Sequence, residues 1–228
     1  MKTAIVCCVH GNEKYGLEVA RRMKRRVAYF IANKEAAKRN VRFIDADLNR
    51  SFPGNPYGNH EERIAFELAA KLAEFDYVVD LHSSSNSCPL FGIITKPDNI
   101  SLAMKLGLER LVVMPRSFAK GKALIDHAKS GISLEIGPHK GKDNAELVER
   151  ALINLLDNKG PAPKINVYEV FGSVKKTSEN VFIKNFQDVK QGQLVAEGQT
   201  AEHDFVAVLV NEEAYPGILC LACRKLKG

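Results

Sequence analysis

Cysteine and long hydrophobic runs are both scarce in this chain of 228 residues. The five cysteines are odd in number and irregularly spaced, which does not fit the disulfide framework of a small secreted protein. The longest apolar run near the N-terminus, residues 4–9, is too short for the core of a signal peptide or for a membrane span. We therefore expect a cytoplasmic protein with no membrane partner.

A second pair of closely spaced cysteines is also missing. Cys220 and Cys223 form a lone Cys-x-x-Cys pair, whereas a structural zinc site needs a second pair. A redox-active pair normally begins a helix, and this one closes a strand-like run. We assign the pair no function, with an exposed, redox-sensitive pair as the alternative.

Acidic residues are outnumbered: 33 Lys and Arg against 27 Asp and Glu give a formal net charge of +6. Much of the excess lies within residues 21–26. No aromatic residues alternate with these basic side chains, as a stacking platform for nucleic acid would require. We interpret them as the solvated, positive end of a helix and predict no nucleic-acid partner, although the net charge favours anionic substrates.

Apolar strand-like runs alternate with helical patterns through the first two thirds of the chain. Strands are expected at residues 3–9, 27–32, 77–81, 90–95, 111–114 and 132–136. Helices are expected from just after Glu13 to about residue 23 and at 61–74, 99–106 and 144–156. This alternation predicts an α/β fold with a mostly parallel sheet flanked by helices.

The composition changes at residues 158–164, where Asn-Lys-Gly-Pro-Ala-Pro-Lys predicts a linker between two domains. The α/β domain spans residues 1–157, and a small all-β domain follows at 165–228. Because a domain of about 65 residues is marginally stable alone, we expect it to pack on the first. Residues 188–198 resemble the hairpins of barrel-sandwich carrier domains, but they lack the turn that holds the modified lysine.

Two histidines and a glutamate follow buried strands of the predicted sheet. His10 and Glu13 come directly after the first strand, and His82 ends the third. Strand ends of open α/β sheets meet at a ligand crevice, and two histidines with one glutamate form a catalytic zinc pattern. Asp80, on the same strand face as His82, could fix the tautomer of that ring. The alternatives are a helix cap at Glu13 and a polar turn at His82.

Glu135 lies within an apolar strand, where burying a carboxylate is costly. It is a candidate general base that deprotonates the attacking water and then protonates the leaving amine. A structural carboxylate in an ion pair is the alternative.

Arg42, Asn49 and Arg50 flank the loop that contains Asp-Leu-Asn-Arg at residues 47–50. An arginine fork binds a carboxylate through two parallel hydrogen bonds, and a neighbouring amide can add a third. A second arginine could stabilise an oxyanion. Solvated surface arginines are the alternative.

Taken in order, these segments resemble the aspartoacylase and succinylglutamate desuccinylase family, a branch of the zinc carboxypeptidase-like enzymes. The matching segments are His-Gly-Asn-Glu at 10–13, Arg42, Asp-Leu-Asn-Arg at 47–50, Asp-Leu-His at 80–82, Glu-Ile-Gly-Pro at 135–138 and Val-Asn-Glu-Glu-Ala-Tyr at 210–215. The resemblance implies a zinc hydrolase domain whose cleft is covered by the small β domain. It also implies hydrolysis of a small anionic N-acyl amino acid, with a metal-bound water as the nucleophile.

The resemblance assigns a role to each residue. It implies one Zn²⁺ per chain, and the three ligands that it implies are His10, Glu13 and His82. Glu135 is the implied base, and Arg42 polarises the scissile carbonyl. Asn49 and Arg50 bind the α-carboxylate of the substrate, while Tyr215 reaches over the cleft from the β domain.

One departure from the family concerns specificity. Ile125 stands where aspartoacylases carry an arginine that binds a second substrate carboxylate. The basic residues that could substitute for it are Arg116, Lys120, Lys122 and Lys129. The sequence leaves open the acyl group, the amino acid, a homo-oligomeric state and the choice of zinc over cobalt or manganese.

Two other functions stay open from the sequence. A zinc carboxypeptidase or a deacylase for bulkier, peptide-like substrates would use the same residues. A non-catalytic protein that binds a partner through its β domain would bind no metal and hydrolyse nothing.

Overall fold

A ten-stranded mixed β-sheet forms the centre of the structure, a computed structural model that describes residues 1–159 and 164–226. The strand order is β2-β1-β3-β6-β4-β5-β7-β12-β11-β8. These strands are β1 (Thr3–Cys7), β2 (Ala28–Ile31), β3 (Tyr77–Ser83), β4 (Cys88–Ile94), β5 (Arg110–Val113), β6 (Ser130–Gly137), β7 (Asn166–Lys175), β8 (Asp188–Val189), β11 (Phe205–Val208) and β12 (Ile218–Lys225). A separate hairpin pairs β9 (Leu194–Ala196) with β10 (Gln199–Thr200).

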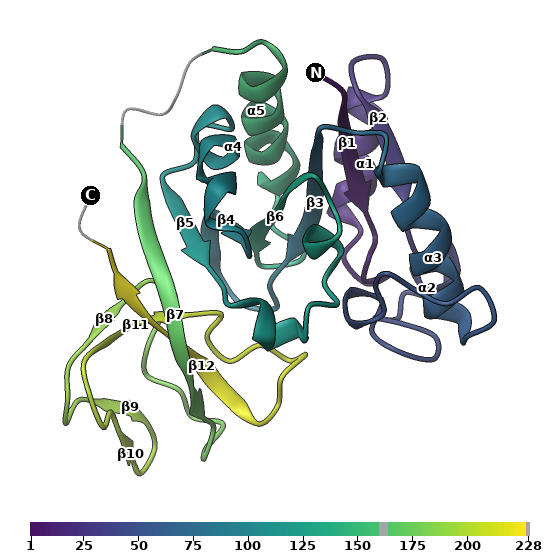
Figure 1. The fold of residues 1–228 in the computed structure, drawn as a ribbon. Helices are drawn as coiled ribbons and strands as arrows, with labels where there is room; N and C mark the ends of the chain where they lie inside the picture. The colour runs from purple at the N-terminus through teal and green to yellow at the C-terminus, as the bar shows by residue number, and fades with distance from the viewer. Residues whose placement is uncertain (160–163, 227–228) are drawn as a thin grey trace.

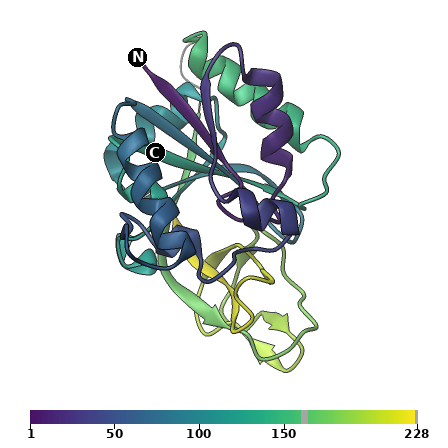
Figure 2. The same ribbon diagram turned by 90° about the vertical axis from the view of Figure 1, so that its right-hand side faces the viewer.

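Helices cover both faces of the N-terminal part of the sheet (Figures 1 and 2). They are α1 (Tyr15–Met23), α2 (Lys34–Arg39), α3 (His60–Leu72), α4 (Ile100–Lys105) and α5 (Asn144–Leu156). α1 and α5 pack together on one face in a core with Ile5, whereas Leu68 of α3 packs on the other face with Ala4. Successive side chains of a strand point to opposite faces, so neighbouring residues of β1 belong to different cores.

The predicted α/β fold is confirmed. Parallel pairs join β2 to β1, β1 to β3, β3 to β6, β4 to β5 and β5 to β7. β4 runs antiparallel to β6, a reversal that hydrophobic patterning could not predict.

The C-terminal strands continue the main sheet, because β7 pairs with β5 on one edge and with β12 on the other. Figure 1 shows these strands, in green to yellow, below and beside the α/β part. The division into domains at residues 157 and 165 stays a prediction, and residues 160–163 of the predicted linker lie outside the described residues.

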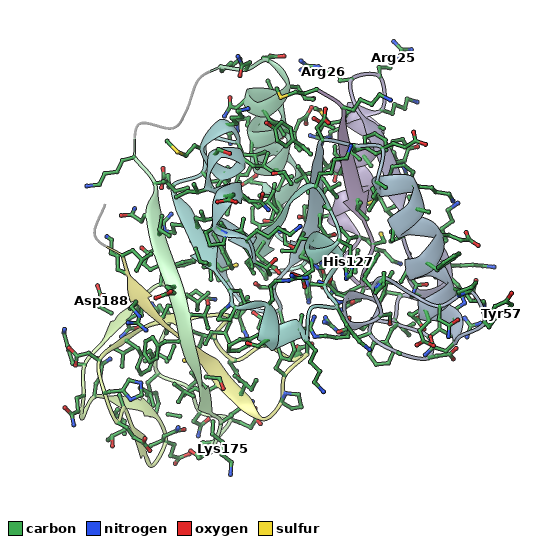
Figure 3. The ribbon with its side chains drawn as sticks, in the orientation of Figure 1. Arg25, Arg26, Tyr57, His127, Lys175 and Asp188 are labelled. Carbon is green, nitrogen blue, oxygen red and sulfur yellow. The ribbon has the colours of Figure 1, made fainter. Side chains whose placement is uncertain are left out.

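The basic run lies in solvent, at the end of α1 (Figure 3). Tyr15, Val19 and Met23 are buried at helical spacing, while Arg25 and Arg26 are exposed. Arg26 pairs with Asp157, just after α5. The interpretation of this run as a solvated helix end therefore agrees with its placement.

Cys220 and Cys223 are not exposed, so the alternative of an exposed redox pair is wrong. Both lie in β12 with no exposed surface, and burial raises the pKa of each thiol to about 12. Thiols in this state are inert, small hydrophobic groups. Across the described residues, no helix combines the length and the apolar character needed to cross a bilayer.

Candidate metal centre and its cleft

Three neighbouring parallel strands bring the candidate residues to one edge of the sheet. His10 follows β1, His82 lies near the end of β3, and Glu135 lies near the end of β6. His82 and Glu135 are direct partners in the β3–β6 register, so their side chains share a face of the sheet. Parallel strands that end together make this edge the natural position of a ligand site.

The side chains of His10, Glu13 and His82 form a buried cluster whose possible ligand atoms all lie within 4.8 Å of one another. The glutamate carboxylate sits between the two rings. Its Oε1 is 2.7 Å from Nδ1 of His10, and its Oε2 is 3.1 Å from Nδ1 of His82. The three residues are only 3–5% exposed. Glu13 therefore faces the histidines and does not cap α1, which begins two residues later.

Each ring presents its other nitrogen to a second carboxylate. Nε2 of His82 is 2.6 Å from Oδ2 of Asp80, and Nε2 of His10 is 3.2 Å from Oδ1 of Asp47. Such carboxylates orient a metal-binding imidazole and raise its basicity. The Nδ1 atoms of both rings are thereby turned toward the same point beside Glu13.

The electrostatics of the cluster suit a cation. Burial alone would raise the pKa of Glu13, but the charges and hydrogen bonds of His10 and His82 lower it well below its usual range. Burial alone would lower the pKa of His82, but Asp80 and Glu13 raise it well above its usual range. The buried carboxylates of Glu13 and Asp80, with the partly buried Asp47, thus stabilise positive charge around the two imidazoles. The donor set of two nitrogens and one carboxylate fits a divalent transition metal.

Glu135 faces the same cleft from β6. Burial raises the pKa of this carboxyl to about 8; His82 opposes that shift, whereas Glu13, Glu212 and Asp80 add to it. A carboxylate of raised pKa is a stronger base, and it accepts a proton near neutral pH more readily than an ordinary glutamate.

Two arginines line the cleft beside the cluster. The guanidinium of Arg42 is 3.0 Å from Oδ2 of Asp47 and 3.6 Å from Oε1 of Glu13. Arg50 donates to the hydroxyl of Tyr215 at 3.1 Å, and Arg42 lies 5.9 Å from the centre of the same ring. Tyr215 thus reaches the two arginines from the C-terminal part of the chain.

Asn49 connects the turn that carries Arg50 to the loop at residues 123–125, of which Ala123 and Ile125 line the cleft. It belongs to a short 3₁₀ turn, Leu48–Arg50, which Asp47 caps by accepting the backbone N–H of Asn49 at 2.8 Å. The side-chain oxygen of Asn49 accepts the N–H of Leu124 at 2.9 Å. A substrate carboxylate needs hydrogen-bond donors, so the amide NH₂ group is the part of Asn49 that can bind it.

The remaining wall of the cleft is largely apolar. Its apolar lining residues are Ile93, Met114, Pro115, Ala119, Ala123, Ile125, Leu209 and Ala214. The basic residues considered as substitutes for an arginine at position 125 do not line the cleft. Arg116 instead pairs with the buried Asp126 at 3.1 Å.

Sequence reasoning did not find two further carboxylates. Asp47 belongs to the Asp-Leu-Asn-Arg segment at residues 47–50, and it contacts both His10 and Arg42. Glu212 lines the cleft and is 8% exposed; its Oε2 accepts the N–H of Ser85 at 2.8 Å and the hydroxyl of Ser85 at 2.6 Å. The contacts of Asp47 with His10 and of Glu212 with Ser85 join segments far apart in the sequence. The sequence signal for both carboxylates is that each lies in a segment that matches the family.

Comparisons with known proteins place these features in context. Residues 1–156 match the model of the succinylglutamate desuccinylase/aspartoacylase catalytic domain. The N-acyl-aromatic-L-amino acid amidohydrolase (carboxylate-forming) of Rattus norvegicus is 30% identical over 76% of this chain and 68% of its own length. The protein of the same name from Xenopus tropicalis is 29% identical over 67% of this chain. That alignment spans only 60% of the relative's length.

Solved structures share the fold. Murine aminoacylase 3 superposes with a TM-score of 0.83 at 22% identity, covering 99% of this chain and 95% of its own. The succinylglutamate desuccinylase of Chromobacterium violaceum superposes with a TM-score of 0.71 at 21% identity, covering 100% of this chain and 85% of its own. These likenesses confirm the fold that the sequence predicts.

Proposed function

Because the chain belongs to the succinylglutamate desuccinylase/aspartoacylase family, we propose that it is a zinc-dependent hydrolase of N-acyl amino acids. The reaction cleaves the amide bond and releases a carboxylate and a free amino acid. The observation that carries this proposal is the buried cluster of His10, Glu13 and His82, with Glu135 paired to His82 in register. The amidohydrolase names of the relatives support it.

The roles of the buried residues follow from their contacts. The Nδ1 atoms of His10 and His82 and the carboxylate of Glu13 would hold the Zn²⁺, which supplies Lewis acidity that activates a water at neutral pH. Asp80 holds the His82 ring by Nε2. Glu135 takes a proton from the attacking water and delivers it to the leaving nitrogen.

The basic residues bind the charged parts of the substrate. Arg42, next to Glu13, is positioned to stabilise the negative charge that develops on the scissile carbonyl oxygen. Arg50 and the NH₂ group of Asn49, which also line the cleft, bind the α-carboxylate. Tyr215 holds the Arg50 side chain in place through its hydroxyl.

The wall of the cleft favours substrates with an apolar side chain. Among the described residues that line it, the arginines are Arg42 and Arg50, and both are assigned to other parts of the substrate. A second substrate carboxylate would find no cation at the part of the wall formed by Ile93, Met114 and Ile125. Burying a charge without a partner is costly. The N-acyl-aromatic names of the relatives agree with this assignment.

A substrate panel tests the proposed specificity. We expect kcat/KM for N-acetyl-phenylalanine to exceed that for N-acetyl-aspartate by about 100-fold, because the aspartate carboxylate would face apolar side chains. The panel includes peptides with free C-termini. A preference for N-acetyl-aspartate would contradict the apolar assignment, and cleavage of peptides alone would favour a carboxypeptidase.

Replacing Arg50 by alanine tests the α-carboxylate site. The measurement is the acid-to-amide ratio, defined as kcat/KM for N-acetyl-phenylalanine divided by kcat/KM for N-acetyl-phenylalaninamide. A charge-assisted hydrogen bond contributes about 1.5–3 kcal/mol, so we expect the ratio to fall by about 10- to 100-fold. Equal losses on the two substrates would show that Arg50 does not bind the carboxylate.

A further inference from the structure

Glu61, in the first turn of α3, is a fully buried carboxylate that lies outside the metal cluster. Its Oε1 accepts the N–H of Ile44 at 2.7 Å and the side-chain N–H of Asn33 at 2.8 Å. Its Oε2 accepts the N–H groups of Asp45 and Ala46 at 3.0 and 3.1 Å. Burial alone would raise the pKa of Glu61, but these bonds lower it below its usual range, so the group is held as the anion.

The three backbone donors, at residues 44–46, lie in the segment 42–50, which also contains the substrate-binding residues. Residues 44–46 join Arg42 to Asp47, and Asp47 caps the turn that contains Asn49 and Arg50. Arg42 precedes residues 44–46 in the sequence and Arg50 follows them, and both arginines line the cleft. Residues 44–46 therefore belong to the stretch of backbone that connects the two arginines.

Contacts run in both directions between this segment and α3. The exposed side chain of Asp45 accepts the N–H of His60, the first residue of the helix, at 3.0 Å. Three successive N–H groups that converge on one anion form a concave backbone arrangement of the kind that binds anions elsewhere. Here the anion is Glu61 itself, and α3 is anchored to the sheet by its buried Leu68 and Leu72.

We propose that Glu61 is a positioning residue for substrate binding: it fixes residues 44–46 to α3 and thereby sets the spacing of Arg42 and Arg50. This inference rests on the proposed function, because it takes Arg50 to bind the α-carboxylate and Arg42 to face the scissile carbonyl. A displacement of about 1 Å far from the reacting atoms can cost about 100-fold in rate. A fixed spacing matters most for a substrate that engages both arginines at once.

The variant Glu61→Gln preserves size but removes one acceptor. Each oxygen of Glu61 accepts two hydrogen bonds, so the NH₂ group of glutamine must face two donors whichever way the amide turns. Glu62→Gln is the matched control, since Glu62 lies in the same helical turn and accepts the N–H of Asn59 at 2.9 Å. Within the described residues, its side chain makes no hydrogen bond to residues 42–50.

The experiment compares the acid-to-amide ratio of Glu61→Gln, Glu62→Gln and Arg50→Ala with that of the wild-type holoenzyme. We expect Glu61→Gln to lower the ratio about tenfold and Glu62→Gln to leave it unchanged. A merely structural role would lower both rates by the same factor, and that result would overturn the inference. If Arg50→Ala also leaves the ratio unchanged, the proposed α-carboxylate site itself has failed.

A second variant, Asp45→Ala, tests the same inference if Glu61→Gln does not fold. Asp45→Ala removes the reciprocal bond to His60 from an exposed position, so the core stays intact. We expect the acid-to-amide ratio to fall in the same direction by a smaller factor. An unchanged ratio in folded Asp45→Ala would contradict the proposed coupling between α3 and the arginines.

Discussion

Replacing Glu135 by glutamine is expected to lower kcat by about 10²- to 10⁴-fold while the bound metal stays in place. Glutamine keeps the size of the side chain and the β3–β6 pairing, but it cannot take a proton from the attacking water. The residue is absent from the cluster of possible metal ligands, so metal content should not change. The measurement is kcat for N-acetyl-phenylalanine together with the zinc content of the same sample.

The control for this variant is Glu109→Gln, because the Glu109 side chain is 76% exposed and does not line the cleft. It should retain wild-type turnover. If Glu135→Gln keeps more than about a tenth of the wild-type kcat, proton transfer by this residue is not required. If it loses zinc along with activity, Glu135 acts as a ligand and the assigned roles must be exchanged.

Replacing His82 by alanine is expected to abolish both metal binding and turnover. The change removes one of three ligands and leaves Glu13 without one of the two rings that stabilise its charge. It also removes the hydrogen bond of 2.6 Å between Nε2 of His82 and the carboxylate of Asp80. Asp80 has no exposed surface, so water cannot replace that bond. The measurement is zinc per chain after dialysis, with the wild-type protein expected to retain about one equivalent, as a site of three protein ligands does.

Two further variants accompany this experiment: Asp80→Asn, which should weaken zinc binding in part, and His203→Ala, which is the control. Asp80 acts on the metal through His82, so its loss should weaken zinc affinity by about 10- to 100-fold without abolishing it. His203 is an exposed histidine of the C-terminal part, with its ring tilted against those of Phe171 and Phe205, and its loss should leave zinc binding unchanged. Retention of a full equivalent of zinc by His82→Ala would remove this residue from the ligand set.

The regular elements were largely predictable because each depends on local patterning. The helix expected at residues 144–156 is α5, with the same bounds, and the apolar run at 77–81 lies within β3. The direction of each strand was harder to predict from the sequence. β4 runs antiparallel to β6 although its sequence is as apolar as that of a parallel strand, because direction depends on the connection and not on side-chain periodicity.

The candidate site also has a part that the sequence could predict and a part that it could not. Residues that end buried strands, such as His10 and His82, could be singled out because polar side chains interrupt apolar runs there. The contacts of Asp47 with His10, of Glu212 with Ser85 and of Glu61 with residues 44–46 join separate segments. No periodicity or spacing encodes such contacts, so they emerge only when the sheet is assembled.

The position of a bound metal tests the central claim most directly. Crystals of the protein grown with zinc can be measured at the zinc absorption edge, where anomalous scattering locates the ion itself. The account predicts a peak beside the Nδ1 atoms of His10 and His82 and the carboxylate of Glu13, with Glu135 near enough to reach a water at that ion. A zinc-loaded crystal whose anomalous peaks all lie elsewhere, with these three side chains still packed against one another, would contradict it.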